Sequence, residues 1–253
     1  MLVLYVRLEY GSAMQTAAHT WNVLEADTPM LTYTYSFGPA TANALAVRGA
    51  GDGLVVVSPP WRVNQTVFEH LRAYGPVRAL VASNAFHYLG ISEWKKRFPD
   101  AAVFAPAQSI ERVARKTGVD TIRPLGDSAS FTGNRVELLE LPYYRTGEAL
   151  VRIRTSSQGV AWYVTDVILN LRELPQQPVL RMLFKLSGNA PGLRFNNIAP
   201  LFMMRDRNAV RRWLAAEYRN DRPRWIIATH GELVDCRAHA HVAERLFEPY
   251  QPY

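Results

Sequence analysis

The strongest constraint on the fold is an alternation of apolar, strand-like runs with amphipathic, helix-like runs between residues 43 and 118. Strands are predicted at residues 43–49, 54–58, 77–83 and 102–106. A Gly-Asp-Gly turn joins the first two strands, which is typical of an antiparallel hairpin. The second and third strands flank a predicted helix over 62–74, and this strand-helix-strand order predicts a parallel pair. Ligands of such folds gather at the carboxyl ends of the strands.

The alternation continues with helices predicted at 91–98 and just before Gly118, and it changes after Gly126. Three strands are then expected in succession, joined by short turns, at residues 135–141, 149–155 and 160–165. Such a meander predicts a second sheet. A helix over 208–218 and a strand over 225–229 complete the pattern.

Length and composition indicate a single domain. With 253 residues, of which 48% are hydrophobic, the chain can bury a substantial core. We assign this domain to residues 21–253 and expect a loose extension over 1–20, in which either Met1 or Met14 is the natural start. Residues 167–207 contain four prolines and little periodicity, so we predict that they form an inserted, lid-like segment on the surface.

Charge and cysteine content limit the partners and the compartment. The formal charge of +7 comes mainly from arginines that are spread along the chain and interleaved with acidic residues, which dilutes any basic patch. Nucleic-acid binding is therefore a third, less favoured hypothesis that rests on charge alone, and we expect a small-molecule substrate if the protein is an enzyme. Cys236 is the only cysteine, which excludes an intrachain disulfide. The first ten residues are too short an apolar run to span a membrane and lack a secretory pattern, so we expect a cytoplasmic protein without a membrane partner. The oligomeric state is not constrained.

Three polar residues directly follow apolar strands: His87, Asp166 and His230. Two imidazoles and one carboxylate are enough to hold a divalent metal with open positions for water. Each residue taken singly is more often an ordinary turn residue, because turns form at strand ends. A second cluster consists of Cys236, His239 and His241, but His241 would point away from Cys236 on a helix, so these residues do not share one face and predict no site.

The order of these residues resembles the metallo-β-lactamase fold superfamily over about residues 20–235. That family carries His-X-His-X-Asp-His, Pro-Gly-His-Thr-Pro-Gly, Gly-Asp and His-Gly motifs. This chain has Ala-Ser-Asn-Ala-Phe-His at 82–87, Pro-Tyr-Tyr-Arg-Thr-Gly at 142–147, Thr-Asp at 165–166 and His-Gly at 230–231. The resemblance implies an α/β fold, a four-layer αββα sandwich.

Several of the family's ligands are replaced in this sequence. The first two histidines fall on Ala82 and Asn84, the aspartate on Phe86 and the meander histidine on Tyr144. The resemblance therefore implies that the first metal site is lost. It implies that a second, reduced site keeps the three remaining ligands, His87, Asp166 and His230.

Two functional hypotheses follow from the reduced site. The first is a mononuclear hydrolase with one zinc or iron ion, acting on an ester, thioester or phosphoester, with Asn84 and Tyr144 binding the substrate. The second is a metal-free, catalytically inactive binding or scaffold protein that retains the fold. The sequence assigns no catalytic residue beyond the metal ligands.

Overall fold

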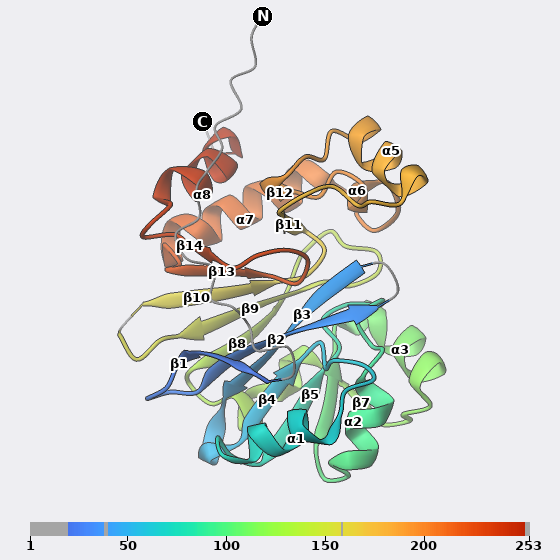
Figure 1. Ribbon diagram of the computed structural model, residues 1–253, viewed down its shortest axis with the longest axis vertical. Helices are drawn as coiled ribbons and strands as arrows, with labels where there is room; N and C mark the ends of the chain where they lie inside the picture. Colours follow the sequence, from blue (N-terminus) through green and yellow to red (C-terminus); the bar gives the residue numbers. More distant parts are fainter. Residues whose placement is uncertain (1–19, 38–39, 158, 251–253) are drawn as a thin grey trace, which may run out of the picture.

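The structure is a computed structural model, and it describes residues 20–37, 40–157 and 159–250. Two sheets are stacked between two layers of helices (Figure 1). The first sheet contains, in spatial order, β1 (Asn22–Glu25), β2 (Met30–Phe37), β3 (Ala40–Arg48), β4 (Leu54–Val57), β5 (Val77–Val81), β6 (Ala102–Ala105) and β7 (Ile122–Pro124). The second contains β14 (Val234–Asp235), β13 (Trp225–Ala228), β10 (Val160–Val164), β9 (Ala149–Arg154) and β8 (Val136–Glu140).

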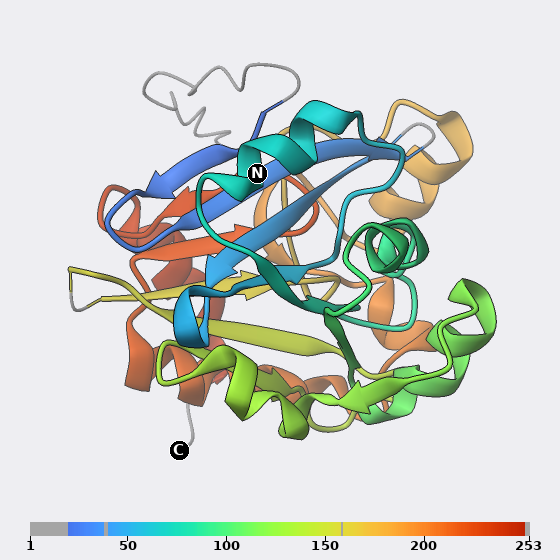
Figure 2. The same cartoon turned by 90° about the horizontal axis from the view of Figure 1, so that it is seen from below.

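The helices form the outer layers. On the side of the first sheet lie α1 (Gln65–Arg72), α2 (Ile91–Arg97) and α3 (Ile110–Thr117), and on the side of the second lie α7 (Arg207–Asp221) and α8 (Ala240–Phe247) (Figures 1 and 2). A short helix, α4 (Ala129–Thr132), precedes β8. This arrangement is the four-layer αββα sandwich that the resemblance implies.

The central strands are buried on both faces, because each sheet packs against helices on one side and against the other sheet on the other. In β4, Leu54 and Val56 pack toward the helices, whereas Val55 and Val57 pack between the sheets. Strand β10 alternates in the same way, with Trp162 facing α7 and α8. The apolar runs in the sequence are continuous for this reason.

Strand directions agree with the predicted pattern. Strands β3 and β4 form the antiparallel hairpin, and β4, β5, β6 and β7 are parallel. The meander β8, β9, β10 is antiparallel, and β10 pairs in parallel with β13. The residues that follow β10 and β13 therefore leave the second sheet at the same edge.

The inserted segment, residues 167–207, has more regular structure than its sequence suggests. It contains an antiparallel pair, β11 (Ile168–Leu171) and β12 (Gly192–Phe195), and two helices, α5 (Pro178–Leu186) and α6 (Ala199–Phe202). Each element has only four to nine residues, so none produces a clear hydrophobic period. A lid-like closure of this segment stays a prediction. The extension predicted at 1–20 lies outside the described residues except for residue 20.

No helix within the described ranges is long and apolar enough to cross a membrane. The longest, α7, is instead tied to the second sheet by ion pairs. Arg152 on β9 binds Asp221 (2.6 Å) and Glu217 on α7, and it also binds Glu137 on β8 (2.5 Å). Its side chain is 14% exposed, so these pairs are partly shielded from water.

Replacing Arg152 by methionine is expected to lower the free energy of unfolding by about 3 kcal/mol, because two partly buried carboxylates on α7 lose their cation. Urea denaturation measures this change. The matched control is Arg154→Met on the same strand, where the side chain is exposed and no such ion pairs are lost. Equal destabilisation by the two substitutions would contradict the anchoring role of Arg152.

Candidate metal centre

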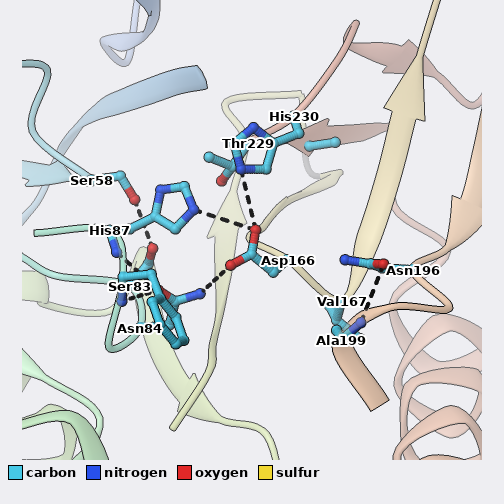
Figure 3. A network of polar contacts seen from close by, with 12 residues as sticks. Ser58, Ser83, Asn84, His87, Asp166, Val167, Asn196, Ala199, Thr229 and His230 are labelled. Atoms are coloured by element: carbon cyan, nitrogen blue, oxygen red, sulfur yellow. Dashed lines mark hydrogen bonds and ion pairs between the residues drawn. The ribbon is translucent and has the colours of Figure 1, made fainter. Parts of the chain in front are cut away.

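His87 is positioned by a turn that follows β5. The side-chain carbonyl of Asn84 accepts hydrogen bonds from the backbone amides of Phe86 (2.8 Å) and His87 (2.9 Å). An asparagine that binds the backbone two and three residues ahead closes a tight turn. The imidazole of His87 is 8% exposed and projects toward the end of β10 (Figure 3).

Asp166 is held from behind by Glu148, the residue before β9. Glu148 Oε1 accepts hydrogen bonds from the backbone amides of Asp166 (2.6 Å) and Val167 (3.0 Å). The amide of Asn84 completes the support, since its Nδ2 donates to Glu148 Oε2 (2.9 Å) and to Asp166 Oδ2 (2.7 Å). One carboxylate oxygen of Asp166 is therefore fixed, and Oδ1 is left for other partners.

His230 follows β13 and is oriented by the end of the first sheet. Its Nδ1 lies 2.9 Å from the carbonyl oxygen of Thr41, so Nδ1 carries the proton and donates. Asn43 secures the same turn, with its Nδ2 donating to the carbonyls of Ala228 (2.8 Å) and Gly231 (2.7 Å). The other ring nitrogen of His230, Nε2, faces Asp166.

The three side chains meet at one point, as the sequence predicts from their strand-end positions (Figure 3). Asp166 Oδ1 lies 3.4 Å from His87 Nε2 and 3.2 Å from His230 Nε2, and the three ligand atoms all lie within 4.8 Å of one another. Among the residues that the structure describes, no other group of three histidines, cysteines or carboxylates gathers in this way.

The two nitrogen-oxygen spacings fit a divalent cation. Ligand atoms bound at 2.0–2.1 Å in a tetrahedral site are separated by about 3.3 Å, which is close to both nitrogen-oxygen distances here. Charge-assisted hydrogen bonds are usually shorter, at about 2.7–2.9 Å. When the ring of His230 is neutral, the hydrogen bond from Nδ1 to Thr41 leaves the lone pair of Nε2 free. Histidines that bind a metal ion have the same arrangement.

The same atoms can also form a cluster without metal. If His230 carries two protons, it donates to both Thr41 and Asp166. Burial lowers the pKa of His230, but the bond and charge of Asp166 outweigh burial and raise it. Burial raises the pKa of Asp166, but the charge of His87 and the bond from His230 hold it well below its usual range. A protonated imidazole thus supplies the positive charge that a metal ion would otherwise provide.

Glu148 is the residue that sequence reasoning missed. It is fully buried, and burial together with the charge of Asp166 raises its pKa well above the usual range. The only signal in the sequence was the position of this carboxylate directly before the apolar start of β9. A carboxylate that is buried with such a strand needs a hydrogen-bonding partner. Its bonds to Asn84 and to the Asp166 amide make it a positioning residue for Asp166.

Asn84 and Tyr144 were predicted to bind substrate. Asn84 is 0% exposed, and both of its polar atoms bind protein groups, so we now propose a positioning role in place of substrate contact. Tyr144 is also buried, but its hydroxyl has no hydrogen-bond partner among the described residues. Burial and the charges of Glu148 and Asp166 raise the pKa of Tyr144, so its hydroxyl keeps its proton, and its contact with a substrate stays a prediction.

The remaining altered positions bring no replacement ligand. Ala82 is buried in the core beside the helices of the first sheet. Phe86 is 42% exposed, and the guanidinium of Arg112 lies 4.8 Å from its ring centre. Ala82, Asn84 and Tyr144 supply no imidazole, and the described residues contain no second group of three potential metal ligands.

Gly231 controls the direction of His230. Its φ is +113°, and an added Cβ would lie 1.8 Å from the carbonyl oxygen of Asn170 in β11. Gly231→Ala is therefore expected to displace the turn and to weaken metal binding at least about tenfold, as loss of ligand orientation does elsewhere. Competition with a fluorescent chelator measures the affinity. Gly126→Ala is the control, because a Cβ added at Gly126 enters open space. An unchanged metal affinity in Gly231→Ala would refute the role of Gly231 in orienting His230.

Comparison with known proteins shows similarity in structure alone. The sequence matches no protein-family model and no curated protein sequence. A metallo-β-lactamase from Erythrobacter litoralis is 18% identical, with a TM-score of 0.58 over 90% of this chain and 96% of that one. One from Hirschia baltica is 14% identical, with a TM-score of 0.51 over 92% and 98%. The DIM-1 metallo-β-lactamase is 14% identical, with a TM-score of 0.52 over 90% and 96%.

These structures align with about nine tenths of this chain. Structural similarity at such low sequence identity establishes the fold alone. The chemistry has to be argued from the residues of this chain. The chain has the metallo-β-lactamase fold, with the His87–Asp166–His230 group at the end of its strands.

Proposed function

We propose that this protein, which has the metallo-β-lactamase fold, is a mononuclear metal-dependent hydrolase of a small ester, thioester or phosphoester. The observation that carries the proposal is the meeting of His87 Nε2, Asp166 Oδ1 and His230 Nε2 at the spacing of ligands around one ion. Three protein ligands with an open position are typical of catalytic zinc sites, and two histidines with one carboxylate also suit iron.

Each residue has a defined part in this proposal. His87, Asp166 and His230 hold the ion, which when bound lowers the pKa of a coordinated water molecule and polarises the substrate. Asn84 and Glu148 fix the Asp166 carboxylate, so that Oδ1 points to the histidines. Thr41 keeps the proton of His230 on Nδ1. Tyr144 supplies a hydroxyl that can bind a substrate oxygen.

Metal analysis of protein purified without added metal tests this function. We expect about one equivalent of zinc or iron and, with generic ester, thioester and phosphodiester substrates, a hydrolysis rate that falls at least about tenfold on chelation and returns when metal is restored. His87→Ala removes both metal and activity, whereas His241→Ala, an exposed histidine on α8, changes neither. Less than about a tenth of an equivalent in the parent, unchanged in His87→Ala, would exclude the proposal.

A metal-free binding or scaffold protein is the second candidate. It is favoured by the ability of the His-Asp-His cluster to satisfy its own charges through a protonated His230, and by the absence of ligands at Ala82, Asn84 and Tyr144. Under this function, His87→Ala and His230→Ala leave ligand or partner binding intact. Reproducible metal-dependent turnover of any test substrate rules it out.

A further inference from the structure

Helix α5 exposes an apolar face that no described element covers. Val179, Met182, Leu183 and Leu186 are 72%, 58%, 42% and 78% exposed. At about 100° per residue they lie on one side of the helix, whereas the half-buried Leu180 lies on another. Figure 1 places α5 at an outer corner of the molecule, beyond both sheets. The helix is thus attached by one side and bare on the other.

The rest of the inserted segment extends this surface. Leu201 and Phe202 of α6 are 62% and 72% exposed. Six of the eight large apolar side chains that are exposed in the described part of the chain therefore belong to α5 and α6. Exposed apolar residues scattered singly are ordinary, but their concentration on one segment marks an interaction surface.

The segment is also strongly cationic. Residues 167–207 carry six exposed lysines and arginines but only two acidic residues. The cations are Arg172, Arg181, Lys185, Arg194, Arg205 and Arg207, and the acids are Glu173 and Asp206. This excess of four positive charges accounts for more than half of the formal charge of the chain, which is +7. On α5, Lys185 borders the apolar face, and Arg181 lies one turn before it on the same side of the helix.

We propose that α5 and α6 bind an anionic lipid surface. An apolar helical face bordered by Lys and Arg lies in the boundary between headgroups and acyl chains, where the long cationic side chains reach the phosphates. A second copy of the chain is a poorer occupant, because a symmetric contact would bring two cationic segments together. A surface helix needs no membrane-spanning run, so the expectation of no membrane partner, which rested on the lack of such a run, does not apply to it.

The position of the surface relates it to the candidate site. Strand β11 begins two residues after Asp166, and Asn170 in this strand accepts a hydrogen bond from the backbone amide of Glu232, just beyond His230. After α6, the chain pairs with the segment that carries Tyr144. A protein bound through α5 and α6 would hold the His-Asp-His group near the lipid surface. Lipid binding itself does not depend on whether a metal is bound.

Co-sedimentation of the full chain with vesicles tests the proposal. Vesicles of equal parts phosphatidylglycerol and phosphatidylcholine are compared with vesicles of phosphatidylcholine alone. We expect binding to the anionic vesicles that falls with added salt, and at least about tenfold weaker binding to the neutral ones. Leu186→Asp and the double variant Arg181→Glu/Lys185→Glu should each weaken anionic binding about tenfold or more.

The matched control reverses two charges on the opposite helix layer. Arg72→Glu/Lys96→Glu alters exposed cations of α1 and α2 and should change binding less than about twofold. Circular dichroism verifies that each variant is folded, as expected for changes at exposed positions. Three results would overturn the proposal: no binding, equal binding to both vesicles, or equal losses in the α5 and control variants. A dimer of the parent chain that Leu186→Asp dissociates would assign the surface to a second copy instead.

Discussion

Asp166→Asn is expected to abolish metal binding while the protein stays folded. Asn84 Nδ2 donates to Oδ2 of Asp166, so the carbonyl oxygen of the new asparagine turns toward Asn84 and its NH2 group turns toward the two histidines. This NH2 group donates to a neutral imidazole and opposes a cation at the same point. The ion thus loses a charged ligand and meets a donor in its place.

Metal affinity in Asp166→Asn should fall by more than about a hundredfold, because losing a ligand costs more than losing its outer partner. Competition titration with a chelator measures this loss, and urea denaturation of the metal-free protein measures stability. Metal-free stability should fall modestly near neutral pH, since the substitution removes the ion pairs of Asp166 with His87 and His230 but can keep the hydrogen bonds. Retention of metal would place the ion elsewhere, and unfolding would show that the Asp166 charge is structural.

Glu148→Ala should have the largest effect on stability. Three buried donors lose their acceptor: the amides of Asp166 and Val167 and the side chain of Asn84. Each unsatisfied buried donor costs about 1–3 kcal/mol, so we expect the free energy of unfolding to fall by about 3–5 kcal/mol. Metal affinity should fall as well, because Asn84 and Asp166 lose their common support.

The control for Glu148 is Glu140→Ala at the other end of the same connection. Glu140 accepts a bond from the amide of Ala107 near the surface, where water can replace it, so the expected loss is about 1 kcal/mol or less. Denaturation curves of the two variants, both without metal, are compared directly. Similar losses of stability in both variants would show that Glu148 does not support the site. An unchanged metal affinity in Glu148→Ala would show that Glu148 stabilises the fold without positioning Asp166.

Most of the fold could be predicted from the sequence. Strands β4, β10 and β13 are continuous apolar runs because both of their faces are buried, and the helices and turns between the strands are marked by glycine and proline. The inserted segment could not be predicted in the same way. Its elements have only four to nine residues, and α5 exposes the apolar face that a sequence pattern assigns to the core.

By itself, the sequence determined the order of the elements and three of the side chains that meet. His87, Asp166 and His230 each follow a strand, and the parallel pairing of β10 and β13 places Asp166 and His230 at the same end of the second sheet. His87 follows a strand of the first sheet, so only the stacking of the two sheets brings it to the other two residues. The support behind them was decided only by the tertiary structure. Glu148 and Asn84 are 64 residues apart, and their hydrogen bond exists because the two sheets join there. A hydrogen-bond network between distant segments has no period or spacing that a sequence can display, since its geometry arises only when the sheets pack.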